Sequence, residues 1–107
     1  MLTVLSGSRP GMIIPLGDGD LTIGRTEDAT HALPDESLSR RHARFFEQGG
    51  RCFVEDLDST NGTFLNGARI AEASPLEDGA RIQLGALTLL RFTLQDETEL
   101  EVTRRVY

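Results

Sequence analysis

The sequence predicts an all-β domain of the β-sandwich class. Three observations lead to this prediction: short apolar runs recur along the chain, turn-forming residues separate most of them, and no segment before Leu94 has a convincing helical period. The chain has 11 glycines, and the pairs Gly49-Gly50, Asn61-Gly62 and Asn66-Gly67 supply residues that tolerate positive φ. Many short strands joined by frequent turns are typical of a sandwich of two packed sheets.

The strand-forming runs follow one another through residues 1–94. Each is short and rich in β-branched, aromatic or other apolar side chains. In chain order they are Leu2–Leu5, Met12–Leu16, Leu21–Ile23, Ala43–Glu47, Cys52–Glu55, Thr63–Leu65, Arg81–Leu84 and Leu87–Leu94. Within the last run, residues 88–94 alternate partly between apolar and polar, which favours a strand with one face in water.

Two polar stretches interrupt this pattern. Thr26–Ser39 is long and poor in strand formers, and Leu57–Gly62 is compact. Long polar loops of a sandwich lie at its ends and commonly carry binding residues, so we expect both stretches to be functional.

The sequence changes character at Gln95. Residues 95–107 are charged and contain no Gly or Pro, with acidic residues first and arginines last, which suits the dipole of a helix. We therefore expect a domain at residues 1–94 and a helical linker at 95–107, leading toward a further C-terminal domain of a longer protein.

Composition excludes several classes of protein. The chain has 107 residues, about one domain. Its apolar runs are far below the roughly 18 residues that span a bilayer, and its start lacks the features of a secretory signal, so a cytoplasmic location is expected. The single cysteine, Cys52, allows no internal disulfide and no multi-cysteine metal site. We expect it to be a small buried hydrophobic residue, and we expect no cofactor.

The net charge of −6 argues against nucleic acid and anionic membranes as partners. Any anion site must therefore be local. All 11 basic residues are arginines, whose planar guanidinium can bind a phosphate through two hydrogen bonds at once.

Polar residues suited to such an anion site lie in turns just beyond strand ends. Arg25 and Arg40 supply cations, and the hydroxyls of Ser39 and Thr60 can donate hydrogen bonds to an oxyanion. The backbone N–H groups around Ser39 and Asn61 add further donors. Together these groups predict a nest for a tetrahedral dianion.

Four short motifs contain these residues and occur in a fixed order. They are Ile23-Gly24-Arg25, Ser39-Arg40-Arg41-His42-Ala43, Asp58-Ser59-Thr60-Asn61-Gly62-Thr63 and Asn66-Gly67. The series resembles the forkhead-associated (FHA) domain over about residues 1–94. The resemblance implies an eleven-stranded β-sandwich of the FHA/SMAD type, whose loops at one end bind a phosphothreonine peptide.

The resemblance also implies a role for each motif residue. Arg25 and Ser39 would hold the phosphate, and Arg40 would contribute through its backbone or side chain. Thr60 would also reach the phosphate, and Asn61 would bind the peptide backbone.

The remaining motif residues would support the site. Gly24 and His42 would be architectural, with the histidine connecting the loops, and Gly62 would complete the Asn-Gly turn. Asn66 and Gly67 would shape a neighbouring turn. Ser37 stands two residues before Ser39, where the family often selects the residue three after the phosphothreonine, and a serine there predicts no selection by charge.

The same residues also suggest two other kinds of chemistry. The pair Ser39 and His42 could suggest a hydrolase, but no nucleophile elbow surrounds the serine and the only other histidine is His31. A metal site would need His31, His42 and Cys52 to come together in a way that the sequence does not predict.

Two further patterns have simple alternatives. A calcium loop starting at Asp56 fails because its sixth and twelfth positions are Asn61 and Gly67. The arginines at positions 40, 41 and 44 taken alone are typical of a solvated surface cluster. Their combination with Arg25 and the two hydroxyl-bearing loops favours phosphate recognition.

Two functions remain at this point, and neither makes the chain an enzyme. The first is a phosphothreonine-binding module in bacterial Ser/Thr-kinase signalling, with a phosphothreonine-containing protein or peptide as partner. The second is a phospho-independent assembly domain on the same scaffold. The linker at 95–107 is similar to the connector of bacterial proteins in which an FHA domain precedes a GGDEF diguanylate cyclase domain, which would link binding to cyclic-di-GMP synthesis. We expect a monomer in isolation, with the linker as a candidate dimerisation element.

Overall fold

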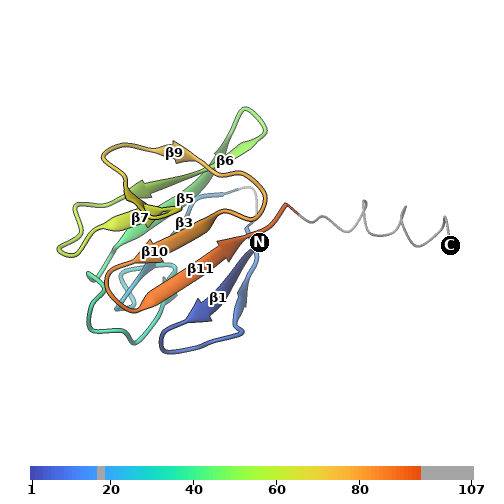
Figure 1. Cartoon of the computed structure of the whole chain (residues 1–107). Coiled ribbons are helices and arrows are strands. Elements are labelled where there is room, and N and C mark those ends of the chain that lie inside the picture. Colours follow the sequence, from blue (N-terminus) through green and yellow to red (C-terminus); the bar gives the residue numbers. More distant parts are fainter. Residues whose placement is uncertain (17–18, 95–107) are drawn as a thin grey trace, which may run out of the picture.

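The computed structural model describes residues 1–16 and 19–94, which form eleven strands in two sheets and no helix (Figure 1). The two sheets pack face to face as a β-sandwich, as the sequence predicts. The expected helical linker at 95–107 lies outside the described residues. Within the part of the chain that is described, no helix is present that could cross a membrane.

The larger sheet has six strands in the order β2-β1-β11-β10-β7-β8. All of its neighbouring strands whose register is defined run antiparallel. Its members are β1 (Leu2–Ser6), β2 (Ile13–Ile14), β7 (Thr63–Leu65), β8 (Ala68–Arg69), β10 (Arg81–Leu84) and β11 (Thr88–Phe92).

The smaller sheet has five strands in the order β4-β3-β5-β6-β9. Its longest pairing joins β5 to β6 over six residue pairs, and β4 runs parallel to β3. Its members are β3 (Leu21–Gly24), β4 (His31–Ala32), β5 (Ala43–Gln48), β6 (Arg51–Asp56) and β9 (Ser74–Pro75).

The core lies between the sheets because alternate residues of each strand point inward. The larger sheet contributes side chains such as Val4, Ile82 and Leu90, and the smaller one contributes Ile23 and Phe45, all of which are buried. Leu33 and Leu38 are also buried in this core and come from the long segment between β4 and β5. This segment is therefore anchored at two points.

All eight strand-forming runs contain a strand, and three short strands were not predicted. These are β4, β8 and β9, each of two residues. The run at Met12–Leu16 shortens to two strand residues, Ile13 and Ile14. Cys52 is half-buried and not fully buried as expected, although it lies on the same side of β6 as the buried Val54 and packs against the core.

Strand ends bring four connecting segments to one end of the sandwich. In the smaller sheet the end of β3 pairs with the start of β5, which pairs with the end of β6. In the larger sheet the end of β10 pairs with the starts of β7 and β11. We call the segments that follow or precede these ends (25–30, 33–42, 57–62 and 85–87) the rim.

Candidate functional site

Ser39 connects the rim segments through its backbone and its side chain. Its carbonyl oxygen accepts a hydrogen bond of 2.9 Å from the backbone N–H of Arg25. Its Oγ accepts one of 3.0 Å from the backbone N–H of Thr60. The three predicted segments around Arg25, Ser39 and Thr60 therefore meet at one residue.

A hollow of about 300 Å³ opens beside Ser39 and is lined by Asp28, Ser39, Arg40 and Arg41. The two arginines are exposed, and no ion pair engages them within the described residues. The hydroxyl of Ser39 and the arginines suit an anion, whereas the carboxylate of Asp28 opposes one.

Arg25, Thr60 and Asn61 do not line this hollow, but the backbone N–H groups of Arg25 and Thr60 bond to Ser39, which does. All three are exposed. Asn61 already uses its side-chain amide, because Nδ2 donates a 2.8 Å hydrogen bond to the carbonyl oxygen of Ser37. The amide oxygen of Asn61 and the side chains of Arg25 and Thr60 make no hydrogen bond within the described residues, so they are available to a ligand.

His42 is fully buried and connects two rim segments. Its Nδ1 accepts a 3.1 Å hydrogen bond from the backbone N–H of Ser39, and its Nε2 lies 2.7 Å from the carbonyl oxygen of Gly62. Because Nδ1 is an acceptor, Nε2 carries the proton and donates it to Gly62. The predicted architectural role of this histidine thus has a specific form: it fixes Ser39 relative to the 57–62 segment.

Gly24 allows the close approach of two segments. A Cβ at this position would lie only 2.7 Å from the carbonyl carbon of Arg40 and 2.9 Å from Cα of Arg41. Since these are backbone atoms, they cannot move aside as the end of a flexible side chain could. Only glycine lets the end of β3 lie directly against the Ser39-Arg40-Arg41 backbone.

Asp56 organises the 57–62 segment, a role that the sequence did not reveal. Its carboxylate accepts hydrogen bonds from the backbone N–H and the hydroxyl of Ser59 and from the hydroxyl of Thr63. The hydroxyl of Ser59 in turn accepts the N–H of Gly62. Burial of Asp56 raises its pKa, but these hydrogen bonds more than offset that effect, so its pKa lies below the ordinary value.

Asp35 joins the 33–42 segment to β11. One carboxylate oxygen accepts the N–H and the hydroxyl of Ser37, and the other accepts the hydroxyl of Thr88, 53 residues away, at 2.5 Å. Burial raises the pKa of Asp35, and the hydrogen bonds from Thr88 and Ser37 outweigh it, so the pKa is lowered. The hydroxyl of Ser37 also accepts the N–H of Ala86, so this side chain is committed to the fold.

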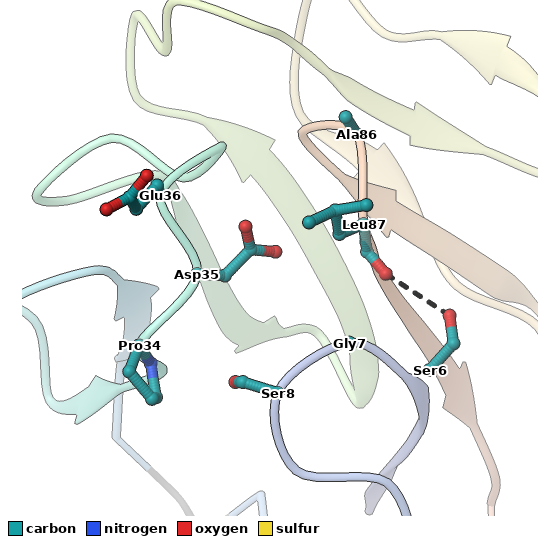
Figure 2. A pocket seen from close by; sticks show the side chains of 8 residues that line it. All are labelled: Ser6, Gly7, Ser8, Pro34, Asp35, Glu36, Ala86 and Leu87. Atoms are coloured by element: carbon teal, nitrogen blue, oxygen red, sulfur yellow. Dashed lines mark hydrogen bonds between the residues drawn. The ribbon is translucent and has the colours of Figure 1, made fainter.

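A larger hollow of about 750 Å³ adjoins the same segment (Figure 2). Three connections line it: the one after β1, the 33–42 segment and the turn before β11. The acidic residues Asp35 and Glu36 line one side of it, with the carboxylate of Glu36 turned outward, and Leu87, which is 61% exposed, lines the other (Figure 2). The hollow therefore suits a side chain that is apolar or positively charged.

Asn66 and Gly67 form the turn between β7 and β8 at the other end of β7 from Gly62. Both have positive φ, 49° and 90°, as a two-residue hairpin turn with an Asn-Gly sequence requires. The backbone N–H and Oδ1 of Asn66 bond to the carbonyl and N–H of Arg81 in β10. The predicted support of the site by these two residues would therefore have to act through the β7–β8 hairpin.

The structure thus brings the predicted residues of three segments together around Ser39. Asp56 and Asp35 are the supporting residues that sequence reasoning missed, since the pattern at Asp56 suggests only a calcium loop. Within the described residues, no three His, Cys, Asp or Glu side chains come close enough to hold a metal ion.

Comparison with known proteins gives consistent results. The model of the FHA domain family matches residues 21–85. The FHA domain-containing protein FhaB of Mycolicibacterium smegmatis is 42% identical over 84 residues, which are 78% of this chain and 54% of that protein. The chain therefore spans about half the length of this curated relative.

Solved structures agree with the sequence relatives. One, from an analysis of phosphothreonine-dependent FHA domain interactions, aligns with a TM-score of 0.74 at 37% identity, covering 88% of this chain and 96% of that one. The FhaA FHA domain, crystallised with the intracellular domain of Rv3910, aligns with a TM-score of 0.73 at 38% identity, covering 84% and 97%. With this fold, these motifs at one rim and these relatives, the chain belongs to the FHA domain family.

Proposed function

We propose that this domain binds a phosphothreonine-containing segment of a partner protein at the rim. The observation that carries the proposal is the meeting of three segments at Ser39, next to a hollow with exposed arginines that have no ion-pair partner in the described residues. FHA domains are phosphopeptide-binding modules. A phosphorylated side chain brings about −1.5 to −2 charges and three acceptor oxygens, which match this donor set.

Each predicted residue has a defined task in this proposal. Arg25 and Arg40 neutralise the dianion, and the hydroxyls of Ser39 and Thr60 donate to its oxygens. Asn61 binds the peptide backbone through the amide oxygen that its bond to Ser37 leaves available. Gly24, His42 and Gly62 keep the segments in position.

The expected affinity follows from the number of hydrogen bonds. Four or five charge-assisted bonds at about 1.5–3 kcal/mol each amount to roughly 10 kcal/mol. Ordering and desolvation reduce this to about 6–8 kcal/mol, which corresponds to micromolar binding. This strength suits a reversible contact downstream of a Ser/Thr kinase.

The acidic and apolar hollow of Figure 2 supports a preference for residues that flank the phosphothreonine. It shares the 33–42 segment with the phosphate site, so an extended peptide can reach both. Because Ser37 is committed to Asp35 and Ala86, selection falls to Glu36 and Leu87. A phosphopeptide library should show enrichment of apolar or basic residues on one side of the phosphothreonine, and Glu36→Lys should remove the preference for basic residues.

Calorimetric titration tests the main proposal. Threonine, phosphothreonine and phosphoserine forms of a selected peptide are compared with the wild-type domain and with Arg25→Ala. We expect micromolar binding of the phosphothreonine peptide and no binding of the unphosphorylated one. The phosphoserine peptide should lose about 0.8 kcal/mol, roughly fourfold in affinity, because the methyl group is missing. Arg51→Ala, which removes an exposed arginine of β6, serves as the matched control.

Equal affinity for the phosphorylated and unphosphorylated peptides would contradict the proposal. Partner binding that survives Arg25→Ala would instead favour the alternative, a phospho-independent assembly domain on this scaffold. The exposed arginines at the rim, which have no ion pair in the part of the chain that the structure describes, support the phosphate-dependent function over this alternative.

We further propose a cytoplasmic setting, a monomeric domain, and neither nucleic acid nor membrane as ligand, on the grounds of charge and composition. The similarity of residues 95–107 to the connector of FHA–GGDEF proteins supports a regulatory role in cyclic-di-GMP synthesis. A parent sequence without a GGDEF motif after Tyr107 would contradict this regulatory role and leave the binding proposal intact.

A further inference from the structure

The outer face of the six-stranded sheet combines arginines with apolar side chains. Antiparallel register places Ile13 beside Thr3, Thr3 beside Arg91, and Arg91 beside Arg81. Leu89 and Gln83 form the next row of the same face. We call these six residues the arginine face. They point away from the core because their neighbours along the strands, such as Ile82 and Leu90, are fully buried.

Acidic residues are missing from this sheet. Its six strands contain no Asp or Glu, although the chain has 17 of them against 11 arginines. The described residues show no ion pair for Arg81 or Arg91. These two arginines nevertheless stand directly opposite each other on β10 and β11, an arrangement that repels across the pair.

In the opposite sheet, one of the two outward arginines is paired with acidic residues. Arg44 of β5 lies 2.5 Å from a carboxylate oxygen of Asp20 and 3.1 Å from one of Glu55. Its guanidinium carbon also lies 4.1 Å from the centre of the Phe46 ring. Arg44 is thus neutralised within the domain, whereas Arg81 and Arg91, like Arg51 of β6, are exposed and have no ion pair within the described residues.

Arg69 extends the positive charge toward the rim. It lies on β8, and its Nε would be only 2.9 Å from a Cβ built on Gly62. Its side chain therefore covers Gly62, next to Asn61. The positive charge of the sheet thereby approaches the rim without using Arg25, Ser39 or Arg40.

We propose that the arginine face is a second docking surface, which binds an acidic segment of a partner protein that also carries apolar residues. Its charge is complementary to carboxylates, and Ile13, 56% exposed, together with the half-buried Leu89 offers apolar contact. A protein segment fits better than a nucleic acid, because the arginines of this face lie among aliphatic side chains that apolar residues of a segment can contact. The surface needs no phosphate.

Fluorescence anisotropy with three labelled probes tests this surface. The first is an unphosphorylated peptide rich in Asp, Glu and Leu, the second has Asn and Gln in place of the carboxylates, and the third is a single-stranded oligonucleotide. Arg91→Glu is the test variant. It replaces one positive charge of the face with a negative charge, which then lies opposite Arg81 and offsets the second positive charge. Arg51→Glu, an identical charge change on the other sheet, is the matched control.

We expect the acidic peptide to bind and the neutral one to bind much more weakly. Arg91→Glu should weaken binding of the acidic peptide about tenfold, with Arg51→Glu close to wild type. Arg25→Ala should leave this binding unchanged, and Arg91→Glu should leave phosphothreonine binding unchanged, so each site can fail without the other.

Three results would overturn the inference. The acidic peptide could fail to bind, or the two glutamate variants could weaken it equally, which would indicate only a general effect of net charge. Tighter binding of the oligonucleotide, lost in Arg91→Glu, would assign the surface to nucleic acid instead.

Discussion

Replacement of His42 by alanine tests whether the buried histidine holds the rim together. The backbone N–H of Ser39 would lose its acceptor. Because this group is only partly buried, the cost lies at the lower end of the about 1–3 kcal/mol of an unpaired buried group. The carbonyl of Gly62 loses less, because it still accepts the N–H of Gly85 at 3.0 Å. Removal of a fully buried ring adds a cavity cost, so we expect a total loss of about 3–5 kcal/mol.

Chemical denaturation followed by circular dichroism measures this loss. A domain of this size has about 5–15 kcal/mol of stability, so the variant should remain largely folded in water. His42→Gln provides the comparison, because its amide can donate to Gly62 while filling most of the space, and it should recover part of the loss. Phosphopeptide affinity should fall in His42→Ala, since Ser39 is no longer fixed relative to Thr60.

A small effect would refute this reasoning. If His42→Ala lowered the free energy of unfolding by less than about 1 kcal/mol with an unchanged denaturant dependence, the two hydrogen bonds would not be holding the segments. Unchanged phosphopeptide affinity in a destabilised variant would show that the histidine serves the fold alone.

Three further predictions concern single residues. Gly24→Ala should lower the free energy of unfolding by about 1–3 kcal/mol in thermal unfolding and weaken phosphopeptide binding, because the added Cβ meets backbone atoms. Gly19→Ala, whose Cβ would meet open space, should change neither. Equal effects of the two substitutions would refute the argument that Gly24 lets two backbones approach closely. The pKa of Asp56 is lower in the folded domain than its ordinary value near 4, so its ionised carboxylate stabilises the fold at pH values above that ordinary value. This stabilisation is lost as the pH falls through the folded-state pKa. Acid titration of unfolding should therefore show a flatter acid limb in Asp56→Asn, and an unchanged limb would contradict this. Arg81→Glu should stabilise the domain by about 0.2–1 kcal/mol in denaturation, since it converts the repulsive pair with Arg91 into an attractive one; a loss of stability would contradict the pairing.

The strands that could be predicted from sequence are those whose own residues favour them. Runs such as Arg81–Leu84 and Thr63–Leu65 carry alternating or β-branched side chains, and they form strands where expected. The three missed strands depend on a partner. His31–Ala32 pairs in parallel with the end of β3, and β9 contains Pro75, which a strand tolerates here because β9 is at the edge of its sheet.

The residues of the candidate site also divide into those that local sequence predicts and those that depend on a distant partner. Gly24 and the motif around Ser39 could be placed because short motifs in order indicate a family. Asp35 could not, because its partner Thr88 is 53 residues away and only the folded chain brings the two together. Asp56 looked like an ordinary polar residue at a strand end until Ser59 and Thr63 were seen to donate to it.

The two ends of the described chain lie side by side. The terminal amine of Met1 lies 2.9 Å from the carbonyl oxygen of Thr93, and the N–H of Thr93 donates to Met1 in return (Figure 1). Neighbouring strands are only about 5 Å apart, so the points at which the polypeptide enters and leaves the domain are separated by about that distance. A domain with this geometry can be spliced into a surface turn of another protein while forcing that turn open by little more than one strand spacing, and its rim would then face outward from the host.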